Sequence, residues 1–393
     1  MSTVTGVHCH DRTRSPVQIS GRENDMTPHI VVLGAGYSGT LAANLAAKRL
    51  KTKVTLVNAS DRFVERVRLH QLASGQQLPD RPIEAMLKGV RLIVDRATGI
   101  DPEQRLIQLA GSAEPIAYDT LIYAPGSRAD LESTPGVAEH AYTVAGAEQS
   151  ARLRERLRES SVVAVVGGGL TGIEAATELA ESHPGLKVRL VTSGELGATL
   201  SQRGRRHLRR TFGRLGIEIR EQAKVTEVRA DGVLLNGGEH FAADTVVWTT
   251  GFTVPDLARE AGFAVDEHGR MIVDETLRSV SHPDVYGVGD AAAARKSDGQ
   301  ELRMACATGL PSAQQAVGAI VARLAGREPK PLHFRYFNQC ISLGRRDALI
   351  QFVRADDSPV EAVLTGRMAA LYKEAVVRGA FKVQSYPSVP TMV

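Results

Sequence analysis

The segment 30–61 of the chain, IVVLGAGYSGTLAANLAAKRLKTKVTLVNASD, decides the fold. Its apolar residues 30–33 predict a buried strand, its alanine-rich residues 40–50 a helix, and residues 53–57 a second strand. A G-x-G-x-x-G pattern joins the first strand to the helix. The first glycine permits a tight turn, the second lets backbone approach a pyrophosphate, and the third lets helix and strand pack closely.

This βαβ context predicts a dinucleotide site at the turn, because the N-terminus of a helix offers unpaired N–H groups to phosphates. The acidic residue typical of the second strand's end is absent, and Asn58 stands there, with Asp61 three residues on. An asparagine can still hydrogen-bond ribose hydroxyls. The predicted contacts of this first site are Gly34, Gly36, Tyr37, Ser38, Gly39 and Asn58.

The same pattern returns at residues 167–172, GGGLTG, again within a complete βαβ unit. Residues 161–166 predict its first strand, 173–181 its helix and 187–192 its second strand. Two such units predict either two dinucleotide sites or one internal duplication with two ligands. The predicted contacts of the second site are Gly167, Gly169, Leu170, Thr171, Gly172, Thr192 and Ser193.

The second unit also lacks the acidic residue that selects a free ribose 2′-hydroxyl, since Thr192 and Ser193 stand at that position. An arginine beside this strand end suits a 2′-phosphate, which favours NADPH over NADH and leaves both open. The arginines that follow begin ten residues past Ser193, so the other interpretation turns them to solvent on a helix. These residues are Arg203, Arg205, Arg206, Arg209 and Arg210.

Length and composition limit the class of protein to which the chain can belong. With 393 residues the chain is too long for one core, so two or three domains are expected. The net charge of +4 is small and no nucleic-acid-binding motif is present, so no nucleic-acid partner is expected. Three scattered cysteines do not make a disulfide framework, which favours a reducing, cytoplasmic compartment. No run of about 18 apolar residues exists, so no membrane-spanning helix is expected.

The first 25 residues are polar, carry mixed charges and lack an apolar centre. They predict a disordered extension and not a signal peptide, with Met26 as a candidate natural start. His8, Cys9 and His10 have no further ligands nearby, so no metal site is predicted.

Residues 62–75, RFVERVRLHQLASG, follow the first unit and hold the candidate catalytic side chains Arg66, Arg68 and His70. Because this loop leaves the same strand edge as the first glycine turn, one interpretation places them beside the reactive ring of a bound cofactor. There they could anchor a polar acceptor or supply a proton. The other interpretation is a solvated basic turn.

The rest of the chain predicts further strands and helices around these two units. Residues 90–101 and 105–109 predict two strands joined by a turn at Asp101 and Pro102, and residues 118–123 predict a strand of the first sheet. The alternating charges of residues 148–159 predict a solvent-facing helix. Another helix is expected to start near Pro311, with a hydroxyl residue beside the proline ahead of an apolar run.

The last 63 residues, 331–393, predict strands at 339–343 and 348–353 and a helix at 363–377. The helix has an apolar stripe that indicates a packed helix, a dimer seam or a face resting on a membrane surface. The apolar residues are Leu364, Met368, Leu371 and Ala375, and the residues expected on the polar side are Arg367, Lys373 and Arg378.

Five stretches in fixed order carry a family resemblance: the first glycine motif, YDTLIYAPGS at 118–127, GGGLTGIEAA at 167–176, VVWTTGF at 246–252 and PDVYGVGD at 283–290. From about residue 28 to 325 the chain resembles the two-dinucleotide-binding flavoproteins of the pyridine nucleotide–disulfide oxidoreductase fold. The resemblance implies an α/β architecture with FAD on the first unit and NADPH or NADH on the second. The second unit is inserted in the first, and a small α+β domain follows.

The implied domains are 26–140 with 260–330 for FAD, 141–259 for NAD(P)H and 331–393 for the acceptor side. Glu174 would lie beside the nicotinamide, and Asp290 would hydrogen-bond the FAD ribityl chain. Pro125 stands where the family usually has a threonine. The further cofactor contacts implied are Ala124, Gly126, Gly251, Gly289, Asp290, Ser312, Ala313 and Gln314.

The cysteine pattern helps to choose among the branches of this family. The disulfide reductases carry two cysteines close in sequence, which this chain lacks. Sulfide:quinone reductases use two distant cysteines, and a pairing of Cys306 with Cys340 is the one candidate, against buried packing of both.

The C-terminal stretches FNQCISLGRRDALI (337–350) and LTGRMAALYKEAV (364–376) resemble type II NADH:quinone oxidoreductases and apoptosis-inducing-factor-like quinone reductases. PSAQQA at 311–316 resembles their quinone-site helix, with Gly318 in place of its last glutamine. The resemblance implies hydride transfer from NAD(P)H to FAD and electron transfer to a quinone-like acceptor. A biosynthetic dehydrogenase or monooxygenase, a ferredoxin reductase and a non-catalytic redox sensor remain alternatives.

Overall fold

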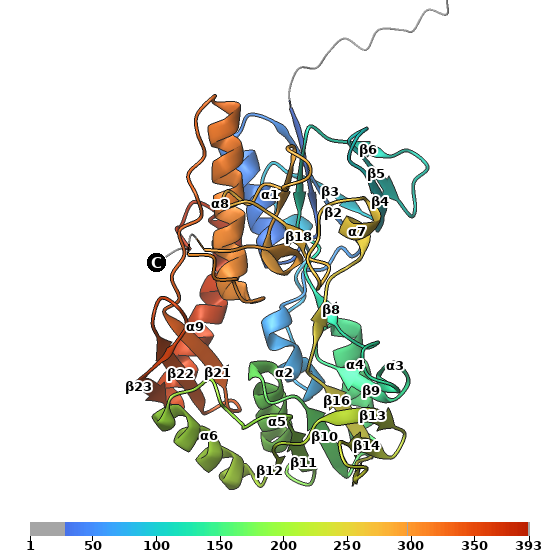
Figure 1. Cartoon of the computed structure of the whole chain (residues 1–393), viewed down its shortest axis with the longest axis vertical. Coiled ribbons are helices and arrows are strands. Elements are labelled where there is room, and N and C mark those ends of the chain that lie inside the picture. Colours follow the sequence, from blue (N-terminus) through green and yellow to red (C-terminus); the bar gives the residue numbers. More distant parts are fainter. Residues whose placement is uncertain (1–27, 297, 392–393) are drawn as a thin grey trace, which may run out of the picture.

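Two parallel five-stranded sheets form the frame of the molecule (Figure 1). The computed structural model describes residues 28–391 except Ser297, so the predicted extension with His8, Cys9, His10 and Met26 lies outside the described residues. The first sheet has the order β19-β7-β1-β2-β3, and every neighbouring pair is parallel. Its elements are β1 (His29–Leu33), α1 (Tyr37–Arg49), β2 (Lys53–Asn58), β3 (Arg91–Val94), β7 (Thr120–Tyr123) and β19 (Val285–Gly287).

The second sheet repeats this architecture with the order β12-β11-β10-β16-β9, again with parallel pairs throughout. Its elements are β9 (Ala141–Thr143), α4 (Ala147–Arg156), β10 (Val162–Val166), α5 (Leu170–Ser182), β11 (Lys187–Val191), α6 (Gln202–Leu215), β12 (Glu218–Arg220) and β16 (Thr245–Trp248). The central strands of both sheets are uninterrupted runs of buried apolar residues, as expected where helices cover both faces.

The second sheet is inserted in the first, because β19 returns to pair with β7 after the whole second unit. The two crossing segments pair with one another as the antiparallel strands β8 (Arg128–Ala129) and β17 (Phe252–Thr253). The predicted fold class is therefore confirmed, and the two crossing strands place residues from both connections beside the same space.

Small sheets of two or three strands flank both units. One prediction here is wrong: residues 90–101 do not form one strand, because β3 and β4 (Ala97–Asp101) belong to different sheets. The chain bends between them at Asp95, whose carboxylate accepts hydrogen bonds from the N–H groups of Arg96 and Gly111. The remaining elements are β5 (Leu106–Leu109), β6 (Ile116–Ala117), α3 (Val137–His140), β13 (Val225–Arg229), β14 (Gly232–Leu235), β15 (His240–Ala242), α7 (Leu257–Glu260), β18 (Met271–Ile272) and β20 (Ala292–Ala293).

Helix α8 (Cys306–Leu324) packs along α1 in the core of the first unit. It begins at Cys306, so the predicted start near Pro311 is wrong. The N–H groups of Thr308 and Gly309 already bond the carbonyl oxygen of Ala305, and the Thr308 hydroxyl bonds it as well. Pro311 therefore lies inside a helix that has already begun, where it donates no backbone hydrogen bond.

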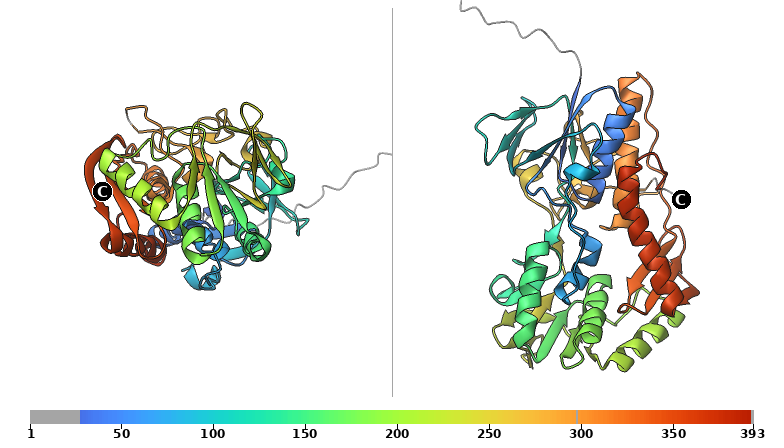
Figure 2. Two further views of the ribbon diagram at one scale, coloured as in Figure 1. Left: turned by 90° about the horizontal axis from the view of Figure 1, so that it is seen from below. Right: turned by 180° about the vertical axis from the view of Figure 1, so that it is seen from behind.

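The C-terminal unit consists of the antiparallel strands β21 (Asn338–Ser342), β22 (Ala348–Val353) and β23 (Pro359–Thr365) and the helix α9 (Gly366–Ser385). The predicted helix at 363–377 is wrong at both ends, since residues 363–365 pair with β22 and the helix continues to Ser385. Figure 2 shows this unit along one side of the molecule, next to both dinucleotide-binding units. Among the described residues, no helix has the length and apolar character needed to cross a membrane.

Asp347 fixes the C-terminal unit to the second sheet. Its carboxylate accepts hydrogen bonds from His207 (2.9 Å), Thr211 (3.1 Å) and Arg214 (2.8 Å) of α6, and from the backbone N–H of Gly366 at the start of α9. Burial alone would raise the pKa of Asp347, but these donors outweigh it and lower that pKa below its ordinary value. The charge therefore sets the position from which α9 starts.

Candidate functional site

A cavity of about 680 Å³ lies between the two glycine turns and α9. Most of the predicted site residues line it, although they come from distant parts of the sequence. This group comprises Gly34, Gly36, Tyr37, Ser38, Asn58, Arg66, His70, Ala124, Gly126, Gly169, Leu170, Thr171, Glu174, Gly251, Gly289 and Asp290. The volume is within the usual range for ligand sites of about 300–1,000 Å³.

The first glycine turn has the geometry that the sequence pattern predicts. Gly34 has φ +97°, and a Cβ there would lie 2.3 Å from the carbonyl oxygen of Ala124. A Cβ on Gly39 would lie 1.8 Å from the carbonyl oxygen of Gly34, so this residue lies behind the cavity and keeps the helix against the strand. A Cβ added to Gly36 would have no atom within 4 Å, so the backbone of Gly36 is open to a phosphate.

The second turn repeats each of these features. Gly167 has φ +121°, and a Cβ on Gly172 would lie 1.9 Å from the carbonyl oxygen of Gly167. The backbone next to Gly169 is open in the same way as that next to Gly36. Both turns therefore fit the pyrophosphate of a dinucleotide, and Gly39 and Gly172 allow helix and strand to pack closely.

Asn58 has a structural role at the first glycine turn, and its ribose contact stays a prediction. Its Oδ1 accepts a hydrogen bond from the N–H of Ala35 at 2.9 Å, and its Nδ2 donates to the carbonyl oxygen of Ser60 at 2.7 Å. The side chain lines the cavity, its Oδ1 holds the glycine turn to the end of β2, and its Nδ2 bonds the segment that follows β2. A neutral amide can accept the hydrogen bond from Ala35, so the turn forms without an acidic residue at this position.

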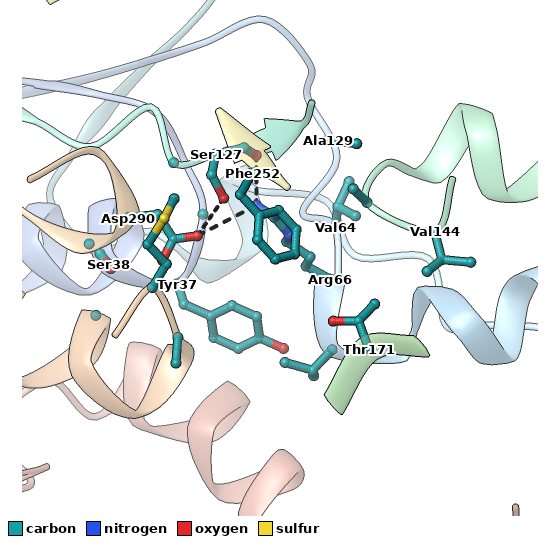
Figure 3. Close-up of a pocket in the computed structure, with 18 of the residues that line it drawn as sticks. Tyr37, Ser38, Val64, Arg66, Ser127, Ala129, Val144, Thr171, Phe252 and Asp290 are labelled. Carbon is teal, nitrogen blue, oxygen red and sulfur yellow. Dashed lines mark hydrogen bonds and ion pairs between the residues drawn. The ribbon is translucent and has the colours of Figure 1, made fainter. Parts of the chain in front are cut away.

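Arg66, Ser127 and Asp290 meet at one wall of the cavity, from three separate segments (Figure 3). The hydroxyl of Ser127 donates to Asp290 Oδ2 at 2.6 Å. Arg66 donates to the carbonyl oxygen of Ser127 at 2.7 Å and lies 3.7 Å from Asp290 Oδ2. Burial lowers the pKa of Arg66, and the charge of Asp290 opposes this change. The Arg66 guanidinium also lies over the ring of Phe252, 5.4 Å from its centre.

Three predicted contacts on α8 do not line the cavity. The Ser312 hydroxyl accepts a hydrogen bond from the N–H of Gly289 at 3.0 Å, so it positions the turn before Asp290. Ala313 is fully buried in the core. The side chain of Gln314 bonds backbone groups of Pro387, Val389 and Thr391, and so anchors the C-terminal segment. The part of α8 that does line the cavity is its first turn, around Ala305 and Gly309.

Lys373 is the main site residue that the sequence did not indicate. It was expected on the polar side of its helix, yet its side chain is only 14% exposed and forms an ion pair with Glu174. It also donates to the carbonyl oxygen of Cys340 at 3.2 Å, and Glu174 accepts from the N–H of Ser342 at 2.9 Å. Burial, reinforced by the charge of Arg68, lowers the pKa of Lys373 to about 7. Lys373 precedes the buried Val377 by four residues and so lies on the same face of the helix. This spacing is the one feature of the sequence that could have indicated a buried position for Lys373.

The other two basic candidates differ in position. His70 of helix α2 (Leu69–Ala73) is 5% exposed and lines the cavity, and its Nε2 has no hydrogen-bond partner in the described part of the chain. Arg68 lies outside the cavity lining and joins Glu65 (3.1 Å) to Glu374 of α9 (2.9 Å). Neither residue belongs to a solvated basic turn.

A second cavity of about 550 Å³ lies beside the second glycine turn and includes Gly168, Gly169 and Leu170. Glu195 lines it, four residues past the end of β11. The five arginines considered for a 2′-phosphate lie on α6 and are not among its lining residues. Arg205 and Arg209 instead pair with Glu195, at 3.0 and 3.5 Å. Thr192 is buried beneath Gly168, while Ser193 is exposed.

Comparisons with known proteins agree with this arrangement. A family model described as pyridine nucleotide-disulphide oxidoreductase matches residues 28–319. An NADH dehydrogenase-like protein of Mycobacterium tuberculosis is 29% identical over 351 residues, which cover 81% of this chain and 86% of that protein. A demethylphylloquinone reductase of Synechocystis is 24% identical over 375 residues, covering 89% and 93%.

Among solved structures, the sulfide:quinone oxidoreductase of Aquifex aeolicus superimposes with a TM-score of 0.77. The match covers 92% of each chain at 20% sequence identity. This likeness concerns the fold.

Proposed function

Because the chain belongs to the pyridine nucleotide–disulphide oxidoreductase family, we propose that it is an FAD-dependent enzyme that oxidises NADH and reduces a quinone-like acceptor. The observation that carries this proposal is the cavity itself. It joins the first glycine turn, residues Leu170 to Glu174 of the second unit, and an apolar wall from α9 that contains Val376 and Val377. Two dinucleotides and an apolar acceptor could therefore meet in one space.

The residues present fit FAD at the first turn. The open backbone next to Gly36 would receive the pyrophosphate, and Asp290 and Ser127 offer oxygen atoms to a polyol chain. The first turn of α8 would direct its unpaired N–H groups and positive dipole end toward the flavin. When bound, FAD supplies hydride acceptance and two-electron transfer.

The protein's own groups then provide position and protons. Glu174 would orient the nicotinamide near the second turn, and it forms an ion pair with Lys373 in a largely buried place. Quinone reduction consumes protons, and an acid within hydrogen-bond reach of the quinone oxygen accelerates such a transfer. We assign this task to the Glu174–Lys373 pair, which lies at the apolar wall, and not to Arg68, which faces Glu65 and Glu374.

Glu195 supports NADH over NADPH. Its carboxylate lines the cavity beside the second turn and engages Arg205 and Arg209. An acidic group near this strand end suits a free 2′-hydroxyl and repels a 2′-phosphate. We therefore propose NADH as the electron donor, in place of the NADPH that the arginine-rich segment favoured.

The direct test is anaerobic reduction of the purified yellow protein with NADH and, separately, with NADPH, followed by an acceptor panel of menadione, a ubiquinone analogue, ferricyanide and oxygen. We expect NADH to bleach the flavin and each quinone to restore it, with kcat/KM for NADH at least about tenfold above that for NADPH, the effect of one lost charge interaction. Absence of bleaching would overturn the first half of the proposal. Reoxidation by oxygen or an iron–sulfur protein in preference to quinones would favour a monooxygenase or a ferredoxin reductase, and bleaching without turnover would favour a redox sensor.

Helix α9 has an exposed apolar face that supports peripheral contact with a membrane. Met368 and Leu371 are each 65% exposed and Val376 is 43% exposed, while the exposed Arg367 and Arg378 lie on the same helix. Quinones with long tails dissolve in lipid, and Val376 also lines the cavity. A lipid surface against this face would place the acceptor at the cavity's apolar wall.

We expect the double substitution Met368→Glu/Leu371→Glu to weaken binding to phosphatidylglycerol-containing vesicles by about tenfold or more, because two apolar side chains lose their burial. Co-sedimentation measures this binding, and turnover with the soluble menadione should not change. Val280→Glu, on an exposed loop of the first unit, is the matched control. Loss of a dimer by the same double variant, with unchanged vesicle binding, would assign the face to a dimer seam instead.

A further inference from the structure

Three carboxylates follow one stripe of helix α5. Glu174, Glu178 and Glu181 are spaced four and three residues apart, so they lie on the same face of the helix. Glu174 lines the cavity, whereas Glu181 accepts a hydrogen bond from the backbone N–H of Arg345 in an exposed turn. Glu178 stands between them and is fully buried.

Glu178 is an unusual residue to bury at this place, because it lacks the complete set of partners that normally accompanies a buried charge. Its Oε1 accepts a hydrogen bond from the Gln76 side chain. Its Oε2 has no hydrogen-bond partner among the described residues, and the nearest cation, Arg345, is 3.9 Å away. Burial raises the pKa of Glu178 to about 7, Arg345 and Gln76 oppose this rise, and Glu181 adds to it. Burial therefore favours the protonated form of Glu178 over a wider pH range than that of an exposed glutamate.

His70 lies on the other side of this stripe, on helix α2, which packs against α5. It lines the cavity, and its unpartnered Nε2 is buried. Burial lowers its pKa well below the ordinary value, and the charges of Lys373, Arg345 and Arg68 add to this effect. Lys373 lines the cavity, and Arg345 lies near Glu178. The neutral imidazole of His70 is therefore affected by charges on the cavity side and on the Glu178 side.

We propose that Glu178, together with His70, forms a proton path from the turn at Arg345 and Glu181 to the Glu174–Lys373 pair in the cavity. This inference rests on the proposed function and names the route by which that reaction takes up its proton. The overall reaction is NADH + H⁺ + quinone → NAD⁺ + hydroquinone. The hydride brings two electrons and one hydrogen nucleus, and the second proton comes from solution through this path. Only O–H and N–H bonds are made and broken along it.

The path makes a prediction that separates proton delivery from electron transfer. Ferricyanide takes electrons and no proton, since NADH + 2 ferricyanide → NAD⁺ + H⁺ + 2 ferrocyanide. Glu178→Gln keeps the size and the hydrogen bond to Gln76 but cannot carry a proton. We expect it to lower kcat with menadione by about tenfold or more, a modest share of the 10²–10⁴-fold typical of a positioned acid. Anaerobic bleaching by NADH and turnover with ferricyanide should stay within about twofold of wild type.

Two further measurements distinguish a proton path from a structural role. Formate or another small weak acid should restore menadione turnover of Glu178→Gln, which it could not do for a misplaced cavity. The infrared spectrum of the protein without substrates should contain, near pH 7, a protonated carboxyl band that is absent from Glu178→Gln. Glu218→Gln, a surface carboxylate of β12 paired with Arg189 and Lys187, is the control and should change none of these values.

The pH profile gives a test with a second variant. Glu178 and Lys373 can each donate a proton below a pKa of about 7, so menadione turnover of the wild type should decline as pH rises through that value. Arg345→Gln removes a charge that lowers the pKa of Glu178, and the decline should therefore move to higher pH. Menadione turnover by Glu178→Gln equal to that of wild type would overturn the path while leaving the proposed function intact. A wild-type protein that is bleached by NADH but reduces no quinone would instead overturn the function.

Discussion

Replacing Gly39 by alanine is expected to give a folded protein that purifies without its yellow flavin. The added Cβ would lie 1.8 Å from the carbonyl oxygen of Gly34, and this oxygen belongs to the backbone of the turn that would receive the pyrophosphate. Backbone cannot rotate away as a side chain can, so the turn must open. A displacement of this kind costs about 3 kcal/mol, which corresponds to about a hundredfold weaker FAD binding.

The second turn offers a matched experiment, because a Cβ on Gly172 would lie 1.9 Å from the carbonyl oxygen of Gly167. Gly172→Ala should keep its FAD and lose affinity for NADH by a similar factor. Flavin absorbance per protein and the NADH concentration needed for anaerobic bleaching measure the two effects. Gly213→Ala, in α6 with nothing within 4 Å of the added Cβ, is the control. Equal loss of FAD in both turn variants would contradict the assignment of one ligand to each unit.

Replacing Lys373 by methionine is expected to cause the second large effect. Methionine is similar in length to lysine but leaves the carboxylate of Glu174 without its cation in a largely buried place. Breaking a buried ion pair from one side costs about 3–5 kcal/mol of the free energy of unfolding. Menadione turnover should fall by about a hundredfold, the usual contribution of a positioned proton donor, while NADH still bleaches the flavin.

The double variant Glu174→Gln/Lys373→Met separates the two consequences. It removes both charges, so most of the lost free energy of unfolding should return, whereas quinone turnover should stay low. Denaturant unfolding and steady-state kinetics measure these quantities on the same samples. Recovery of turnover in the double variant would show that Lys373 acts on stability alone. A single Lys373→Met variant with wild-type turnover would remove the pair from the proposed reaction.

The two βαβ units could be predicted because their causes are local. A positive φ at Gly34 and Gly167 and the close approach at Gly39 and Gly172 depend on residues a few positions apart. The apolar sequences of β1 and β10 directly indicate strands whose sheets are covered on both faces. The α/β class and the two glycine turns therefore followed from local sequence, whereas the insertion was implied by the family resemblance and depends on the distant pairing of β19 with β7. The pattern was weaker at element ends. The starts of the helices expected near Pro311 and at residue 363 were wrong, because hydrogen bonds to Ala305 and pairing with β22 outweighed local preference there.

The partners of the polar side chains were decided only by the tertiary structure. Lys373 meets Glu174 across 199 positions of sequence, and Gln314 meets the C-terminal segment instead of a cofactor. Nothing in the sequence distinguishes Glu178 from other glutamates in a helix, but in the folded protein it is fully buried and lies near Arg345. Glycine geometry and helical periodicity are properties of short segments, so the sequence alone contains them. The function of a charged side chain depends on the groups around it, and these groups come from distant segments that only the fold brings together.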